Sequence, residues 1–148
     1  MFWGCFSSSG TGKLVAIEGL MKSDDYITIL EENLKTSARS LGLGRRWFFQ
    51  HDNDPKHKSK STTAWLQKNQ VTVLPWPSMS PDLNPIENLW RELKVKINNR
   101  APKNLQELKR VAIEEWNNIP PETAANLVKN YRKRLLSVIR MKGHAIDY

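Results

Sequence analysis

The chain has 148 residues, of which 39% are hydrophobic and 26% are charged, as is typical of one globular domain with a buried core. This composition excludes a disordered, collagen-like or coiled-coil chain, and no apolar run approaches the ~20 residues of a membrane span. Lysine and arginine outnumber the acids by 23 to 15, so the net charge of +8 favours a polyanionic partner. The single cysteine, Cys5, cannot form an internal disulfide and favours a reducing compartment.

The first third of the chain predicts two strands, a helix and a third strand. Two apolar runs around a Gly/Ser loop predict a β-hairpin over residues 1–18. Ser23 is a candidate N-cap for a helix that runs to about Arg39 and ends at Gly42. The run over residues 46–51 predicts a strand, and its Trp-Phe-Phe sequence indicates burial on both faces.

The remainder is predicted to be mainly helical. A helix over 58–69 and a short strand over 71–74 precede a proline-rich loop over 75–85. Three further helices are expected, over about 85–99, 104–118 and 121–141. The order ββαβαβααα predicts an α/β domain in which a mixed sheet is flanked by helices.

Asp52 stands where the predicted hydrophobic strand ends. A carboxylate at that edge is fixed by the strand while its oxygens reach an open crevice, which suits a ligand or metal site. Asp54 and Pro55 fit the turn that follows, and Asp52 itself also fits turn chemistry. Both interpretations of Asp52, a site carboxylate and a turn residue, remain open from the local sequence.

Glu87 lies at the start of a predicted helix and also has two interpretations. Asn84 is placed to cap the helix, Pro85 suits its first position and Glu87 falls third, which is the spacing of a capping box. On the helix surface Glu87 lies beside Arg91 and Lys94, away from the apolar stripe. This pattern fits an edge that binds metal and phosphate, and it equally fits a solvated face with an i,i+4 Glu–Arg pair.

Together, these segments resemble the catalytic core of mariner-type DDE transposases, most closely the Sleeping Beauty-like members. Between Asp52 and Glu87 there are 34 residues, which is the family's interval between its second and third catalytic carboxylates. The resemblance covers essentially the whole chain. Its most specific segments are Trp3–Phe6, Gln50–His57, Trp76–Ser78, Ser80–Trp90 and Glu115–Trp116.

The resemblance implies an RNase H-like mixed sheet flanked by helices, lacking the first, central strand. It implies that Asp52 and Glu87 are catalytic metal ligands. The implied cofactor is Mg²⁺ or Mn²⁺, with two ions in the complete site, because a two-metal site acts on both the attacking and the leaving oxygen of a phosphodiester. The side chains expected to contact DNA are Lys56, His57, Arg91 and Lys94.

The resemblance also carries expectations about partners and extent. The expected partner is DNA, as transposon ends and target, with a homo-oligomer or pairing with full-length transposase, in the nucleus and not at a membrane. Residues 1–148 are expected to be a single catalytic domain, truncated at its N-terminus, without the family's helix-turn-helix domains and first catalytic Asp. The reaction of the family is metal-dependent DNA cleavage and strand transfer, and the isolated chain is expected to be inactive.

Two other hypotheses fit the same sequence. One is a non-catalytic DNA- or protein-binding module derived from a transposase, and the other is a non-functional remnant that barely folds. The expected absence of one acid is what separates them from an active enzyme. Any DNA binding is expected to be weak, sequence-tolerant and salt-dependent, because phosphate contacts would dominate it.

Overall fold

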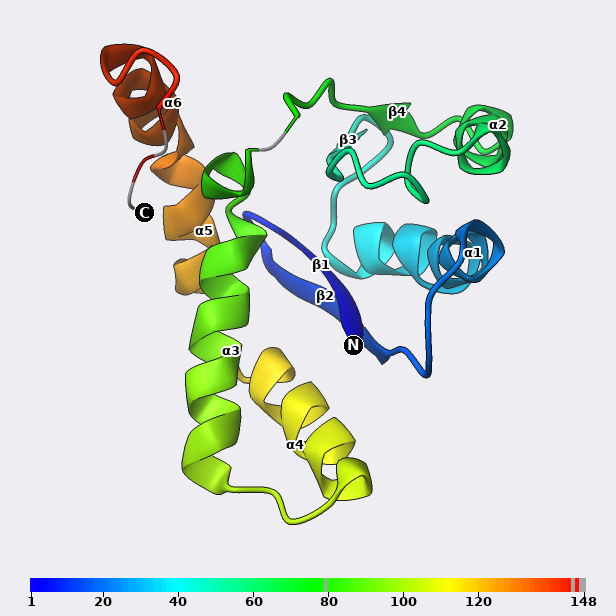
Figure 1. The fold of residues 1–148 in the computed structure, drawn as a ribbon, viewed down its shortest axis with the longest axis vertical. Coiled ribbons are helices and arrows are strands. Elements are labelled where there is room, and N and C mark those ends of the chain that lie inside the picture. Colours follow the sequence, from blue (N-terminus) through cyan, green and yellow to red (C-terminus); the bar gives the residue numbers. More distant parts are fainter. Residues whose placement is uncertain (79, 145, 147–148) are drawn as a thin grey trace.

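The computed structural model describes residues 1–78, 80–144 and 146, and Figure 1 shows its fold. Residue 79 of the expected loop over 75–85 lies outside the described residues. The elements in chain order are β1 (Phe2–Ser7), β2 (Gly10–Ala16), α1 (Ser23–Ser40), β3 (Phe48–Phe49), α2 (Lys60–Lys68), β4 (Thr72–Val73), a 3-10 turn (Pro81–Leu83), α3 (Ile86–Arg100), α4 (Leu105–Asn117), α5 (Pro121–Lys129) and α6 (Tyr131–Arg140). None of the described helices is both long and apolar enough to cross a membrane.

The predicted hairpin is confirmed. β1 and β2 pair antiparallel, with Trp3 opposite Val15 and Gly4 opposite Leu14. Successive side chains of a strand point to opposite faces, so Trp3 and Gly4 belong to different sides of the hairpin. Trp3 and Leu14 accordingly lie in two separate hydrophobic clusters.

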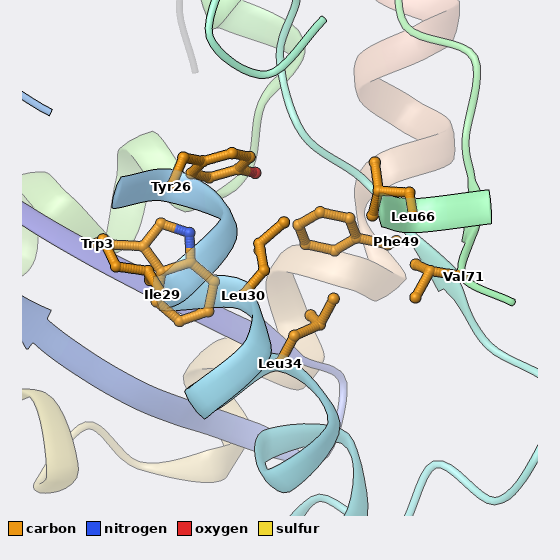
Figure 2. Packing of buried hydrophobic residues seen from close by; sticks show 8 residues of the cluster. All are labelled: Trp3, Tyr26, Ile29, Leu30, Leu34, Phe49, Leu66 and Val71. Carbon is orange, nitrogen blue, oxygen red and sulfur yellow. The ribbon is translucent and has the colours of Figure 1, made fainter. Parts of the chain in front are cut away.

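These two clusters cover both faces of the hairpin. In Figure 1, α1 lies on one side of it and α3 and α4 lie on the other. The first cluster, drawn in Figure 2, comprises Trp3, Tyr26, Ile29, Leu30, Leu34, Phe49, Leu66 and Val71. The second comprises Leu14, Leu89, Leu93, Ala112, Trp116 and Ile119. The hairpin therefore lies between the two hydrophobic clusters and packs against both.

The strands form two separate pairs. β3 pairs in parallel with β4, with Phe48 opposite Thr72 and Phe49 opposite Val73, and neither is hydrogen-bonded to the hairpin. β1 and β3 instead line the same cavity, whose volume is about 360 Å³. The α/β class with mixed pairing is confirmed, as one antiparallel and one parallel pair, and among the described residues no strand lies between the hairpin and β3.

The prediction that the aromatic run before Asp52 is buried on both faces is wrong. β3 is only two residues long, and Phe49 is buried while Phe48 is 69% exposed. Phe49 packs into the first cluster beside Leu30 and Leu66. No described strand or core cluster covers the opposite side of β3, so the alternating side chain Phe48 stays in solvent.

α1 begins differently from the prediction. Ser23 is its first helical residue and not its N-cap, which is Lys22. The backbone N–H of Lys22 donates to Asp25 Oδ2 at 2.8 Å. An acid of the first turn therefore reaches back to the N-cap backbone, and Ser23 has no capping role.

The last predicted helix is divided in two at Asn130. The N–H of Asn130 bonds to the carbonyl of Asn126 and ends α5, and α6 begins at the next residue. Arg134 of α6 is buried and donates to Asn88 Oδ1 at 2.8 Å and to the carbonyl of Asp82 at 3.3 Å. These long-range bonds fix α6 against the start of α3, so the chain changes direction. They also bury Arg134, although its neighbours in the sequence, Arg132 and Lys133, are basic and exposed.

Gly4 is required where the hairpin meets the second cluster. The rings of Trp90 and Trp116 stack there with centroids 5.0 Å apart, and Trp116 Nε1 donates to the carbonyl of Gly12 at 2.9 Å. A Cβ on Gly4 would lie 2.8 Å from Trp90 Cη2 and 3.2 Å from Trp116 Cζ2. Only a glycine lets β1 approach both indole rings.

We expect Gly4→Ala to lower the free energy of unfolding by about 1–3 kcal/mol, because an added methyl overpacks the two indoles. Chemical denaturation measures this directly. Ser8→Ala, in the exposed turn of the hairpin, is the control and should unfold like the unchanged protein. Equal stability of the Gly4→Ala chain would show that the indoles have room to move.

Candidate functional site

Asp52 and Glu87 lie at the same cavity although 34 residues separate them in sequence. Asp52 follows the end of β3, and Glu87 is the second residue of α3. Burial raises the pKa of Glu87, and the negative charge of Asp52 raises it further. The two carboxylates are thus close enough for the charge of Asp52 to disfavour the charged form of Glu87.

Asp52 combines both of the interpretations drawn from its sequence. Its Oδ1 accepts the backbone N–H of Asp54 at 3.1 Å and lies 2.6 Å from His57 Nδ1. The carbonyl of Asp54 in turn accepts the N–H groups of His57 and Lys58, which confirms the turn expected at Asp54 and Pro55. Oδ2 of Asp52 has no hydrogen-bond partner among the described residues, and the side chain is 55% exposed. One oxygen therefore builds the turn, and the other is available to a ligand.

Neither structural role predicted for Glu87 is observed. The N-cap of α3 is Pro85, in a helical conformation, and no side chain caps the helix. A capping box needs an extended N-cap residue with an acceptor side chain, which proline lacks. Within the described part of the chain, the Glu87 carboxylate also forms no ion pair, so the expected pair with Arg91 is absent. Its oxygens remain uncommitted.

Tyr26 of the first cluster packs against His51 and His57, and His57 contacts Asp52. The hydroxyl of Tyr26 lies 3.0 Å from His51 Nδ1, and the ring of His57 lies 4.1 Å from that of Tyr26. Burial, and then the charge of Asp52, raises the pKa of Tyr26, so its hydroxyl keeps its proton and can donate to His51. Burial lowers the pKa of His51 to about 4, and the ring is neutral at pH 7. The spacing of the sequence motifs gave no signal for Tyr26, which comes from α1.

The four side chains expected to bind DNA divide into two pairs. Lys56 forms an ion pair with Asp54, and His57 contacts Asp52, so both are engaged with acids of the same turn. Arg91 and Lys94 are exposed on α3 and form no ion pair with any described residue.

A second group of cations lies away from the carboxylates and was missed by the sequence reasoning. A groove of about 960 Å³ beside the start of β3 is lined by Lys35, Arg39, Arg45 and Arg46, and none of its described lining residues is acidic. These residues come from the end of α1 and the loop after it, where only Arg45 and Arg46 are adjacent in the sequence. Only the folded chain gathers them.

The donor set at the cavity suits a hard cation. Its only acidic residues among those described are Asp52 and Glu87, and no described group of three or more His, Cys, Asp and Glu could hold a metal ion. Mg²⁺ takes oxygen ligands and commonly binds through one or two carboxylates, with waters and substrate phosphates as the rest. The residues present therefore fit part of a magnesium or manganese site.

We expect the midpoint of thermal unfolding, measured with a chelator present, to fall as the pH is lowered from 6.5 to about 4. The unfolded chain takes up a proton on His51 near the ordinary value, whereas the folded chain resists it, so protons favour unfolding in that window. His51→Asn, whose amide oxygen can stand near the place of Nδ1 and still accept from Tyr26, should make this fall smaller. His144→Gln, at an exposed position, should leave it unchanged. Identical pH profiles for the unchanged and His51→Asn chains would contradict the assignment.

Comparison with known proteins gives both a family and a fold. A family model described as a DDE superfamily endonuclease matches residues 3–109. Over 148 residues the chain is 39% identical to the Tcb1 transposase of Caenorhabditis briggsae and 37% identical to the Tc1 transposase of Caenorhabditis elegans. All of this chain is matched, and it spans 54% of the length of each of these two relatives.

Solved structures of Mos1 transposase share the fold. The Mos1 catalytic domain with Raltegravir and Mg superposes with a TM-score of 0.84 at 20% identity, covering 97% of this chain and 75% of that one. The mariner Mos1 paired end complex with Mg gives a TM-score of 0.83 at 20% identity, covering 95% of this chain and 42% of that one. The expected RNase H-like fold is thereby confirmed. The family match shows that this chain belongs to the DDE superfamily endonucleases, with Tc1/mariner transposases among its relatives.

Proposed function

We propose that this chain serves metal-dependent DNA cleavage and strand transfer, with Asp52 and Glu87 as ligands of the divalent cations. The observation that carries the proposal is that two carboxylates border one cavity, and each offers oxygen that no described group uses. Their mutual repulsion also supports it, because a bound divalent cation would relieve it.

In this proposal two acids bind the cations and two basic residues bind DNA. Asp52 would offer Oδ2 while Oδ1 stays fixed in its turn, and Glu87 would offer its carboxylate from the start of α3. Arg91 and Lys94, on the same helix as Glu87, would contact DNA phosphates. Bound Mg²⁺ or Mn²⁺, two ions in a complete site, would supply activation of the attacking oxygen and stabilisation of the leaving oxygen.

For the isolated chain, we propose binding without catalysis. Only two acids among the described residues line the cavity, and two-metal catalysis requires both ions at a fixed separation. A displacement of about 1 Å in such a site can cost ~10²-fold in rate. We therefore propose that the chain alone binds a cation and DNA without cleaving DNA at an appreciable rate.

We expect the chain to bind Mn²⁺ measurably, and Asp52→Asn and Glu87→Gln each to weaken that binding about tenfold or more, because each removes a charged oxygen ligand. Isothermal titration calorimetry with Mn²⁺ gives the affinities. Glu31→Gln makes the same charge change at an exposed position of α1 outside the cavity and is the control. If all four proteins bind Mn²⁺ equally, the carboxylate pair is not a metal site.

We expect the chain to bind duplex DNA carrying a transposon end without cutting it, in Mg²⁺ or Mn²⁺. Arg91→Gln combined with Lys94→Gln should reduce the slope of log affinity against log salt by about 2, because each lost phosphate contact removes about 0.9 of that slope. Fluorescence anisotropy across salt concentrations measures the slope, and a gel assay with end-labelled DNA detects cleavage.

The matched control for DNA binding is the pair Arg45→Gln and Arg46→Gln, which removes the same charge from the groove beside β3. If the groove variant lowers the salt slope more than the α3 variant does, DNA binds at the groove beside β3 and not beside the carboxylates. Robust cleavage that Asp52→Ala abolishes would overturn the proposal of binding without catalysis and point to a further acid. DNA binding with no Mn²⁺ binding at the pair would favour the alternative, a non-catalytic DNA-binding module.

The Mos1 structures support DNA as the partner, since one is a paired end complex of that transposase. Pairing with a second copy or with a longer transposase, and a nuclear location, belong to the same proposal. Gel filtration with and without transposon-end DNA tests the pairing.

A further inference from the structure

We propose that His57 is a positioning residue that holds Asp52 by one oxygen so that the other is presented to the cation. This inference rests on the proposed function of Asp52. Its geometric basis is the contact of 2.6 Å between His57 Nδ1 and Asp52 Oδ1, the same oxygen that accepts the N–H of Asp54. Two donors on one oxygen restrict both torsions of the aspartate side chain, and Oδ2 is left without a partner among the described residues.

His57 is itself fixed on several sides. Its ring packs 4.1 Å from that of Tyr26 and lies parallel to that of His51, at 5.3 Å and 8°. Its backbone N–H donates to the carbonyl of Asp54 at 2.9 Å. Tyr26 is 1% exposed and bonded to His51, so the ring of His57 rests on a rigid part of the core. A continuous set of packed groups thus connects α1 with the carboxylate.

The position of the ring also determines which nitrogen carries the proton. A carboxylate only accepts, so Nδ1 of His57 donates to Asp52. Nε2 is buried and has no hydrogen-bond partner among the described residues. Leaving a buried nitrogen unpaired opposes folding, so the ring is held in this orientation by the contact of Nδ1 with Asp52 and by its packing against Tyr26 and His51.

The inward placement separates this role from direct contact with DNA. The side chain of His57 is only 14% exposed, whereas that of Asp52 is 55% exposed. Phosphate contacts would need an accessible donor, and the one polar atom of the ring that does not face Asp52 is buried. His57 therefore acts through Asp52, as the outer partners of metal ligands commonly do.

Three substitutions of the full chain separate positioning from packing. In His57→Asn the amide nitrogen can stand near the place of Nδ1, so the donor to Asp52 is kept while the ring is lost. His57→Leu keeps apolar volume between the neighbouring rings and loses the donor. His57→Gln places its donor near the position of Nε2, where Asp52 is out of reach.

Mn²⁺ affinity and the thermal midpoint are measured for each chain. We expect His57→Leu and His57→Gln to weaken Mn²⁺ binding by about tenfold or more, within the 10- to 100-fold range of outer-shell partners. His57→Asn should bind Mn²⁺ more tightly than both, although its thermal midpoint should fall furthest because its side chain is the smallest of the three and leaves the largest gap between the neighbouring rings. Affinities that follow the thermal midpoints, or an unaltered affinity in His57→Leu, would overturn the inference.

A further measurement on the unchanged chain keeps the inference testable if the variants unfold. The ¹⁵N shifts of the imidazole rings, assigned by NMR, should show the His57 proton on Nδ1, and a proton on Nε2 alone would overturn the inference. Asp52→Asn distinguishes a failure of the positioning role from a failure of the metal site. If it weakens Mn²⁺ binding and His57→Leu does not, only the positioning role fails, whereas if neither weakens it, the proposed metal site fails as well.

Discussion

Burial of both faces of the β1–β2 hairpin is the constraint on which the rest of the structure depends. Trp3 faces α1 and β3 on one side, and Leu14 faces α3 and α4 on the other. Asp52 follows an element of the first side and Glu87 begins an element of the second. The hairpin thus sets where the two acids lie relative to each other, and Gly4, which admits the two indole rings, is where this arrangement is tightest.

The cavity carries the negative charge of Asp52 and Glu87, and no described lysine or arginine pairs with either carboxylate. The nearby cation Lys56 is paired with Asp54, and His51 is held neutral by burial. Asp52 and Glu87 are left at one cavity, and burial, followed by the charge of Asp52, raises the pKa of Glu87. Such a site is unfavourable by itself and becomes favourable when a cation binds, which is the behaviour expected of a metal site.

The fold also leaves surface that the described strands do not cover. β3 pairs with β4 along one edge, and Phe48 is exposed on a strand that reads as fully buried in the sequence. Arg134 of α6 donates hydrogen bonds to the carbonyl of Asp82, in the turn before α3, and to Asn88, in the first turn of α3. The start of α3, which carries Glu87, is thereby held from two directions, by the second cluster and by α6.

The sequence by itself determined the features that depend on near neighbours. Alternation predicted the hairpin, apolar periodicity predicted the positions of α1 to α4, and the residue types at Asp54 and Pro55 predicted their turn. The interval between Asp52 and Glu87, through the resemblance that it carries, also indicated the family. Only the tertiary structure decided that Glu87 takes no part in capping α3, that His57 contacts Asp52 and that Arg134 is buried. These three depend on packing between segments far apart in the chain, and no local pattern encodes which partner a polar side chain meets there.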